Sequence, residues 1–575
     1  MRRLRSHEWL LGRDELGFQH RGALRLLGLD VDRYRGEPVV GIANAWSELS
    51  PCDVSLRMTA EAVKAGVRRA GGIPLEFPVL GLGEDLCKPS ALLLRNLASM
   101  ELEETLRAYP LDAVVLLGGC DKTIPAQLMA AASADLPALQ LNAGPRPAGR
   151  FRGERLGSGT SLWRLWDEVR AGRLAETEFR EVERALFPAP GACNVMGTAS
   201  TMAALAEVLG MMPAGFSTRP AALPERFAAA EAAGERIVAM IDEDLRPSRV
   251  LTPGAFDDAI RALLALGGST NAVLHLLAIA GRAGVPLGLD RFDALSGDVG
   301  ALVDVQPAGA GLVEDLDRAG GVPAVLKRLE PLLDGRTPTV SGRPWREILA
   351  GAAPPPESVV RPLDRPLAPA PALAVLRGSL APSGAVLKAA AATPSLLRHE
   401  GPAVVFDSYE EMLARVDDPA LDVTPRSVLV LRHAGPKGAP GMPEWGHIPV
   451  PRKLQQLGVA DMVRVSDARM SGTAYGTAVL HVAPEAAVGG PLALVRSGDR
   501  IALDVPARRL DLLVAEEELR ARRARWAPPP SPHRRGFPRL CLDTVLQADE
   551  GCDLDFLRPR DEAARRFVPP TVGRS

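Results

Sequence analysis

The sequence predicts an α/β protein of two domains, an amino-terminal α/β domain with a mostly parallel sheet and a carboxyl-terminal β-rich domain. Three observations lead to this prediction. The chain has 575 residues, which is more than a single ordinary hydrophobic core holds. Apolar runs of strand length alternate with longer helical patterns in the first part of the chain. Short apolar runs separated by Gly, Pro and Asp turns follow in the second part.

The amino-terminal part contains two short apolar runs that each precede a helical pattern. The run "VVGIANA" (39–45) precedes "VSLRMTAEAVKAGVRRAGG" (54–72), and "DAVVLLGG" (112–119) precedes "IPAQLMAAASA" (124–134). Two more helices are predicted in "GACNVMGTASTMAALAEVLG" and "TNAVLHLLAIAGRAG". Strand–helix alternation of this kind is typical of a parallel sheet with helices on its faces.

A proline-rich segment, "AGAAPPPESVVRPLDRPLAPAPAL" (350–373), predicts an interdomain linker and places the domains at 1–360 and 361–575. Six short runs after it favour a barrel or a sandwich. They are "LAVLRG", "PAVVFDS", "SVLVLRH", "DMVRVSD", "PLALVRSGDRIALDV" and "LDLLVA". A second proline cluster, "WAPPPSPHRRG", separates a short tail that ends in "CLDTVLQADEGCDLDFL".

The composition excludes several classes of partner. A net charge of -2 gives no reason to expect nucleic acid or an anionic membrane as a partner. The opening segment "MRRLRSHEWLLGRDELG" has an apolar run that Arg13 and Asp14 interrupt, which is too short for a signal peptide. No stretch approaches the roughly 20 apolar residues of a membrane span. We therefore expect a cytoplasmic protein.

Six cysteines are too sparse for a disulfide scaffold and are expected to be reduced. Cys52, Cys120 and Cys193 each stand before a predicted helix, and successive members are 68 and 73 residues apart. A helix N-terminus favours negative charge, which predicts a lowered thiol pKa at all three positions. Three thiolates that converge at strand ends could hold an iron–sulfur cluster with one open iron position. Buried structural thiols and a single nucleophile are the alternatives.

Two segments, "CDKTIPAQLMAA" and "GACNVMGTASTMAAL", resemble the signature stretches of the dihydroxyacid and sugar-acid dehydratases, the family that also contains 6-phosphogluconate dehydratase. Further segments match in the family's order: "WSELSPCD", "GLGEDLCKPSALLLRNLASMELEE", "LGGSTNAVLHLLAIAG", "RGSLAPSGAVLK", "GPAVVFDS", "GPKGAPGMPEW" and "SDARMSGTAYG". The resemblance covers essentially the whole chain. It implies an iron–sulfur dehydratase, with a β-barrel-like carboxyl-terminal domain and the site between the two domains.

The resemblance also implies roles for nine residues. The cluster, [2Fe-2S] as in the sugar-acid branch or else [4Fe-4S], would be held by Cys52, Cys120 and Cys193. A magnesium ion, Mg2+, would be held by Glu84, Asp121, Glu444 and Lys122, the lysine carried as its carbamate. The catalytic base would be Ser471, with Thr473 beside it. The resemblance gives no role to Cys87, Cys541 and Cys552, which are expected to be buried or incidental.

The dehydration of a 2,3-dihydroxy acid explains why such residues are needed. The C2 proton is weakly acidic and hydroxide is a poor leaving group from C3, so an iron with an open position would help as a Lewis acid. Charge that builds on the substrate carboxylate favours magnesium, which prefers oxygen ligands. An ammonium at Lys122 would repel that ion, whereas a carbamate is itself a carboxylate. The Ser471 hydroxyl needs nearby cations or N–H groups to act as a base.

Within the family, "SDARMSGTAYG" and "QADEGCDLDFL" resemble the sugar-acid (aldonate) branch, such as the L-arabinonate or D-xylonate type. The expected reaction converts an aldonate to a 2-keto-3-deoxy acid by loss of water from C2 and C3. The alternatives are dihydroxyacid dehydratase of branched-chain amino acid synthesis and 6-phosphogluconate dehydratase. A thiol-dependent enzyme built on Cys120 without a cluster and a catalytically inactive relative are further alternatives. The resemblance also implies a homodimer or homotetramer.

Overall fold

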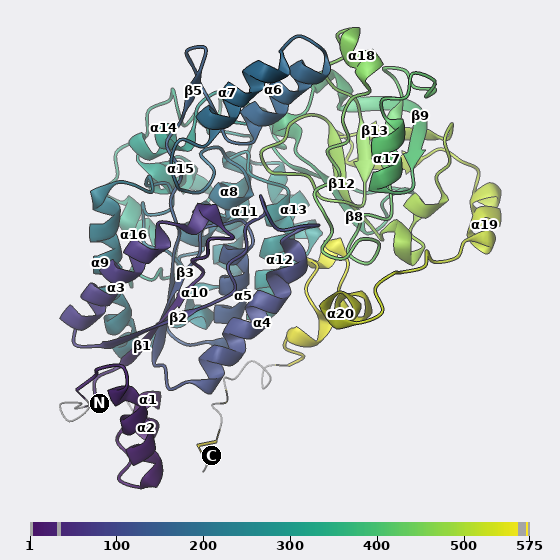
Figure 1. Ribbon diagram of the computed structural model, residues 1–575. Coiled ribbons are helices and arrows are strands. Elements are labelled where there is room, and N and C mark those ends of the chain that lie inside the picture. Colours follow the sequence, from purple (N-terminus) through teal and green to yellow (C-terminus); the bar gives the residue numbers. More distant parts are fainter. Residues whose placement is uncertain (1–3, 31–35, 562–567, 569–570, 573–575) are drawn as a thin grey trace.

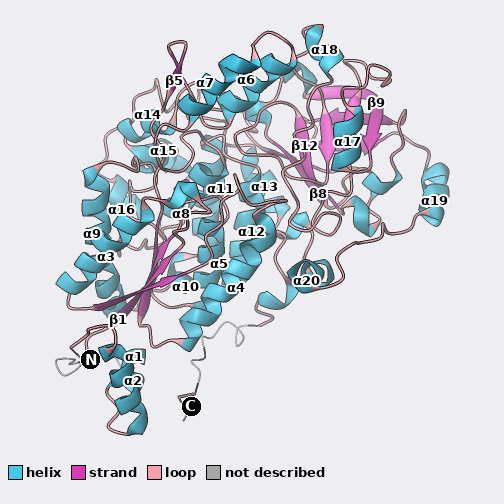
Figure 2. Ribbon diagram, in the orientation of Figure 1, coloured by secondary structure: helices cyan, strands magenta, loops and turns pink. Residues whose placement is uncertain are grey.

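Two sheets, one in each half of the chain, organise the molecule (Figure 1; Figure 2). The computed structural model describes residues 4–30, 36–561, 568 and 571–572. Helices surround the amino-terminal sheet, and the carboxyl-terminal sheet curves into a barrel-like body beside them. The predicted fold class is therefore confirmed. The predicted outer domain limits, residues 1 and 575, lie outside the described residues, and the boundary at 360 stays a prediction.

The amino-terminal sheet has four parallel strands in the order β2-β1-β3-β4. Their bounds are β1 Val39–Asn44, β2 Ile73–Pro78, β3 Ala113–Leu117 and β4 Ala138–Leu141. Strands β1, β3 and β4 are buried along their whole length, which explains why they consist mostly of apolar residues, with Asn44 and Gln140 as exceptions. The β1 and β3 runs are the two that the sequence predicts.

Helices pack on this sheet and extend beyond it. Those of the amino-terminal half are α1 Arg5–Leu10, α2 Glu15–Arg25, α3 Leu56–Arg69, α4 Leu92–Ala108, α5 Thr123–Ala134, α6 Thr160–Arg170, α7 Glu176–Leu186, α8 Thr198–Val208, α9 Pro224–Glu243, α10 Pro247–Val250, α11 Pro253–Ala265, α12 Asn271–Ala283, α13 Leu289–Ser296, α14 Val313–Arg318, α15 Gly321–Leu329 and α16 Trp345–Leu349. Helices α3, α5, α8 and α12 are the predicted ones. Within the described residues, no helix is both long and apolar enough to cross a membrane.

The carboxyl-terminal sheet has eight strands in the order β14-β13-β9-β10-β11-β12-β8-β7. Their bounds are β7 Ala374–Leu376, β8 Gly384–Leu387, β9 Arg398–Phe406, β10 Val428–Leu431, β11 Arg464–Ser466, β12 Ala478–Ala483, β13 Arg500–Asp504 and β14 Arg509–Leu512. The four central strands are parallel and the outer pairs antiparallel. Arg377, just after β7, bridges to Arg509 of β14, so the sheet nearly closes on itself. Of the two predicted architectures, the barrel is therefore the one that the structure adopts.

Short helices pack on the barrel, and one predicted run becomes a strand only in its second half. The helices are α17 Tyr409–Arg415, α18 Arg452–Gln456, α19 Glu516–Arg525 and α20 Gly536–Thr544. The run "PLALVRSGDRIALDV" begins with a 3-10 turn, Pro491–Leu494, and its strand is β13. Pro491 has no N–H to donate to a neighbouring strand. Leu492 is nevertheless buried in the barrel core, although it is not part of a strand.

The first proline-rich segment and the tail after the second one both pack on the amino-terminal half. The 350–373 segment lacks regular structure, but Arg361 N donates to Leu302 O at 2.8 Å and Leu367 N to Ala301 O at 2.7 Å. The tail after the second proline cluster is not a separate element. It returns to the amino-terminal half, where Arg282 of α12 pairs with Asp553 at 2.7 Å.

Candidate active site

Cys120 lies at the carboxyl end of β3, three residues beyond its last strand residue and three before the start of α5. The Thr123 hydroxyl caps this turn, accepting from Cys120 N at 3.1 Å. A Cβ on Gly119 would clash with Ala143 and Asp53, so only glycine lets this turn approach the neighbouring loop so closely. That neighbouring loop carries Cys52.

The three predicted cluster cysteines meet at this edge of the sheet. Cys52 and Cys120 are buried, and Cys193 is half-buried in the loop before α8. The Cys120 thiol hydrogen-bonds with the Cys52 thiol, and Cys193 is close enough to Cys52 to interact electrostatically with it. Arg146 Nη2 also donates to Cys52 Sγ at 3.5 Å. Three loops far apart in the sequence thus place their sulfur atoms together.

The predicted lowering of the thiol pKa is wrong for two of these cysteines. The hydrogen bond with Cys52, followed by burial, raises the pKa of the Cys120 thiol well above its usual range. Burial, followed by the charge of Cys52, raises the pKa of the Cys193 thiol to about 12. Loss of water around the thiolates therefore outweighs the helix N-termini when no metal neutralises the thiolates.

Beside the cysteines, the carboxylates of Glu84, Asp121 and Glu444 form ion pairs with two buried cationic side chains. Lys122 Nζ contacts Asp121 and lies 3.4 Å from Glu84 Oε2. The Arg469 guanidinium lies 2.7 Å from Glu444 Oε1 and 3.6 Å from Glu84 Oε1. Neither cation has any exposed side-chain surface. Glu84 therefore links the Lys122 and Arg469 ends of this charge cluster.

The charge cluster sets the ionisation of its members. Burial alone would raise the pKa of Glu84, but Lys122 and Arg469 hold it below its ordinary value. Burial raises the pKa of Asp121 to about 6 despite the opposing charge of Lys122. Burial would lower the pKa of Lys122, yet Asp121 and Glu84 raise it above its ordinary value. In the absence of metal, the lysine is therefore an ammonium that compensates the carboxylates.

Ser471 and Thr473 join the same network from the barrel side. Their hydroxyl oxygens are 2.9 Å apart. Asn271 Nδ2, at the start of α12, donates to Glu444 Oε1 at 2.7 Å and to Met470 O at 3.3 Å. This side chain connects the Ser471 loop to the carboxylates. All nine predicted residues thus lie in one continuous set of contacts between the two halves, although their roles stay predictions.

The donor atoms fit the two implied cofactors by their chemistry. Three thiols and no fourth cysteine beside them suit a cluster with one open iron position. Three carboxylates suit magnesium. Among the described residues, however, no three His, Cys, Asp or Glu side chains could hold a metal ion as they stand. The Lys122 ammonium lies between Asp121 and Glu84 instead, so a cation there requires the lysine to lose its positive charge.

Sequence reasoning missed residues that the structure places in the network. Arg469 lies in "SDARMSGTAYG" and Asn271 in "LGGSTNAVLHLLAIAG", and both contact Glu444. A charged side chain in a glycine-containing motif and an amide at the start of an apolar helix are signals that could have identified them as site residues. Trp163 of α6, whose indole N–H reaches Thr473 Oγ1 at 3.0 Å, gives no such signal. Of the other cysteines, Cys541 and Cys552 are buried and Cys87 is half-buried.

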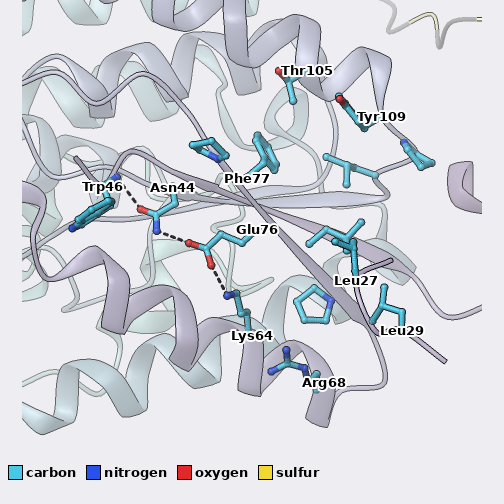
Figure 3. Close-up of a pocket in the computed structure, with 15 residues that line it drawn as sticks. Leu27, Leu29, Asn44, Trp46, Lys64, Arg68, Glu76, Phe77, Thr105 and Tyr109 are labelled. Atoms are coloured by element: carbon cyan, nitrogen blue, oxygen red, sulfur yellow. Dashed lines mark hydrogen bonds and ion pairs between the residues drawn. The ribbon is translucent and has the colours of Figure 1, made fainter. Parts of the chain in front are cut away.

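A cavity of about 810 Å³ lies elsewhere, against the edge strand β2 (Figure 3). Three of its polar side chains contact one another, since Asn44 donates to Glu76 at 2.8 Å and Glu76 also pairs with Lys64. None of the nine predicted residues lines it. The candidate site is therefore the buried network and not this cavity.

Two family models match the chain. Residues 37–348 match the model described as "Dihydroxy-acid/6-phosphogluconate dehydratase N-terminal". Residues 358–552 match the corresponding C-terminal model. Together they span both sheets and all nine predicted residues.

Similar proteins cover nearly the full length of the chain. An L-arabonate dehydratase of Azospirillum brasilense is 49% identical, over 96% of this chain and 97% of the relative. A 6-deoxy-6-sulfo-D-gluconate dehydratase of Pseudomonas putida is 47% identical, over 96% of each chain. A dihydroxy-acid dehydratase of Ignicoccus hospitalis is 42% identical, over 93% of this chain and 98% of the relative.

Proposed function

Because this chain belongs to the dihydroxy-acid/6-phosphogluconate dehydratase family, whose members are hydro-lyases, we propose that it dehydrates a sugar acid, an aldonate, to a 2-keto-3-deoxy acid. The observation that carries the proposal is the single contact network that joins three cysteines, three carboxylates and the Ser471–Thr473 pair. The identities of 49% and 47% to sugar-acid dehydratases, against 42% to a dihydroxy-acid dehydratase, favour an aldonate. Dihydroxy-acid dehydration is the second candidate.

The iron–sulfur cluster would be held by Cys52, Cys120 and Cys193. When bound, it supplies a Lewis acid that makes the C3 hydroxyl a better leaving group. We favour [2Fe-2S] over [4Fe-4S]. The surrounding protein contributes Arg146, which donates to Cys52 Sγ and to the carbonyl oxygen of Gly191 at 3.1 Å. It thereby ties the Cys52 loop to the Cys193 loop.

The magnesium ion would be held by Glu84, Asp121, Glu444 and the carbamate of Lys122. When bound, it supplies positive charge to the substrate carboxylate. Arg469 keeps two of these carboxylates in place through its contacts with Glu444 and Glu84. Asn271 orients Glu444 from the other side.

Ser471 is the proposed base that takes the C2 proton, and Thr473 supports it with a hydrogen bond between the two hydroxyls. The Ser471 oxygen also accepts from Thr473 N at 3.4 Å. Hydrogen bonds to an oxygen favour its charged form and so make more of the alkoxide available to take a proton at neutral pH. The expected quaternary structure is a homodimer or homotetramer.

The test is an anaerobic preparation of the full chain, measured for iron, acid-labile sulfide and visible absorption, and assayed with magnesium for 2-keto acid release. The substrates are L-arabinonate, D-xylonate, 6-deoxy-6-sulfo-D-gluconate, 6-phosphogluconate and 2,3-dihydroxyisovalerate. We expect a coloured protein that acts on an aldonate. Cys120→Ser should lose colour and activity, whereas Cys541→Ser should retain both. A colourless, iron-free protein with full activity would favour the thiol-dependent alternative, and inactivity after cluster reconstitution would favour an inactive relative.

A further inference from the structure

Helix α6 of the amino-terminal half packs against the loop that carries Ser471 and Thr473. Figure 1 shows α6 with α7 at the edge of the molecule nearest α18 and the barrel. Four α6 residues at helical spacing contact the carboxyl-terminal half: Thr160, Trp163, Asp167 and Arg170. Spacings of three, four and three residues place them on one face of the helix. Two of these contacts end on Thr473 itself.

Thr473 is held closely on several sides. The Thr160 hydroxyl donates to Thr473 O at 2.8 Å, and Trp163 Nε1 donates to Thr473 Oγ1 at 3.0 Å. A Cβ on Gly159 would lie 2.5 Å from Thr473 Cβ, and a Cβ on Gly197 would lie 2.7 Å from Thr473 Cγ2. Two glycines therefore leave room for this one side chain, whose rotamer is fixed by its surroundings.

The contact with Trp163 leaves the Thr473 hydroxyl hydrogen available for a second partner. An indole N–H only donates, so Thr473 Oγ1 accepts from Trp163. The single hydroxyl hydrogen of Thr473 must then find an acceptor. Among the described residues, Ser471 Oγ is the one acceptor in hydrogen-bond range of that hydroxyl. Donation from Thr473 to Ser471 satisfies this hydrogen and gives a chain of donors from Trp163 to Thr473 to Ser471.

We propose that Trp163 is a positioning residue that orients the Thr473 hydroxyl so that it donates to Ser471 Oγ and supports that oxygen as a proton acceptor. This inference rests on the proposed function, because it gives Ser471 the role of base. Trp163 acts through Thr473 and does not touch the reacting atoms. Its ring also packs on His447 at 6.0 Å between centroids, and a phenylalanine would retain that packing. Trp163→Phe therefore removes the N–H donor and keeps an aromatic ring at this position.

The test compares Trp163→Phe with Trp166→Phe, the same change three residues further along α6. Trp166 is 43% exposed and packs on Phe179, without contact to Thr473. We expect Trp163→Phe to lower kcat about tenfold with KM within about twofold, since the Thr473 hydroxyl that donates to Ser471 Oγ loses the N–H that orients it. Trp166→Phe should match the wild type. Equal kcat for Trp163→Phe and wild type would overturn the proposal.

A double-mutant cycle separates orientation from general support of the fold. Thr473→Val removes the hydroxyl that Trp163 orients, so Trp163→Phe should cost nothing further in that background. Multiplicative losses in kcat would instead mean that the indole acts independently of Thr473 and would overturn the proposal. If the wild type releases no 2-keto acid, the proposed function fails. If the wild type is active and the cycle is multiplicative, the Trp163 inference alone fails.

Discussion

The buried ion pair between Arg282 and Asp553 should be essential for stability. The Arg282 guanidinium donates to both Asp553 oxygens, at 2.7 and 3.1 Å, and to Glu103 Oε2 at 3.2 Å. The side chains of Arg282 and Asp553 have no exposed surface. Arg282→Met fills much of the space but leaves a carboxylate buried without its cation. Breaking a buried pair in this way costs about 3–5 kcal/mol.

Urea-induced unfolding followed by tryptophan fluorescence measures this loss. The matched control is Arg291→Met, which breaks the ion pair with Asp257, where the arginine is 46% exposed. An exposed pair of this kind is worth about 0–1 kcal/mol, so the control should unfold close to the wild type. The reasoning is refuted if Arg282→Met lowers the free energy of unfolding no more than Arg291→Met. The tail that carries Asp553 would then contribute little to holding the halves together.

Two further predictions concern a close approach and a buried amine. Gly159→Ala should lower kcat about tenfold or more, because Gly159 has φ +80° and its new Cβ would overlap the Thr473 side chain. The control Gly153→Ala has φ +84° in open space, and equal kcat losses for the two would contradict the overlap argument. Burial lowers the pKa of Lys388 from its ordinary value of 10.5 to about 7. Between these two pH values the lysine is neutral in the folded state and protonated in the unfolded state. Relative to Lys388→Met, the wild type should gain stability as pH rises from about 7 to about 10, and parallel stability curves would contradict this.

The predictable part of the fold is the part in which burial leaves a local pattern. Strands β1 and β3 are buried on both faces and end at turns, so their apolar runs are visible in the sequence. Strand β8, Gly384–Leu387, is a short run inside a motif and lacks the flanking turn spacing of the others. The start of the run at Pro491 is apolar because Leu492 packs in the barrel core, and only the later part of that run is the strand β13. Barrel closure depends on the Arg377–Arg509 bridge, which no local pattern indicates.

The candidate site was predictable as a set of residues but not as a set of contacts. Cysteines and carboxylates in a family's motifs can be identified one by one, and the structure brings them together. Trp163 could not be identified, because on an amphipathic helix an indole is most often a packing residue. The thiol pKa prediction failed at Cys120 and Cys193 because position before a helix is local, whereas burial depends on the whole fold.

The most direct test of the account is kcat/KM of the anaerobically purified wild type and of Ser471→Ala, with L-arabinonate or D-xylonate against 2,3-dihydroxyisovalerate. We predict that the wild type favours an aldonate by about tenfold or more, a transition-state difference of about 1.4 kcal/mol. Ser471→Ala should lose about a hundredfold or more while keeping the iron content of the wild type. Wild-type preference for 2,3-dihydroxyisovalerate would contradict the substrate assignment, and full activity of Ser471→Ala would contradict the role given to the serine.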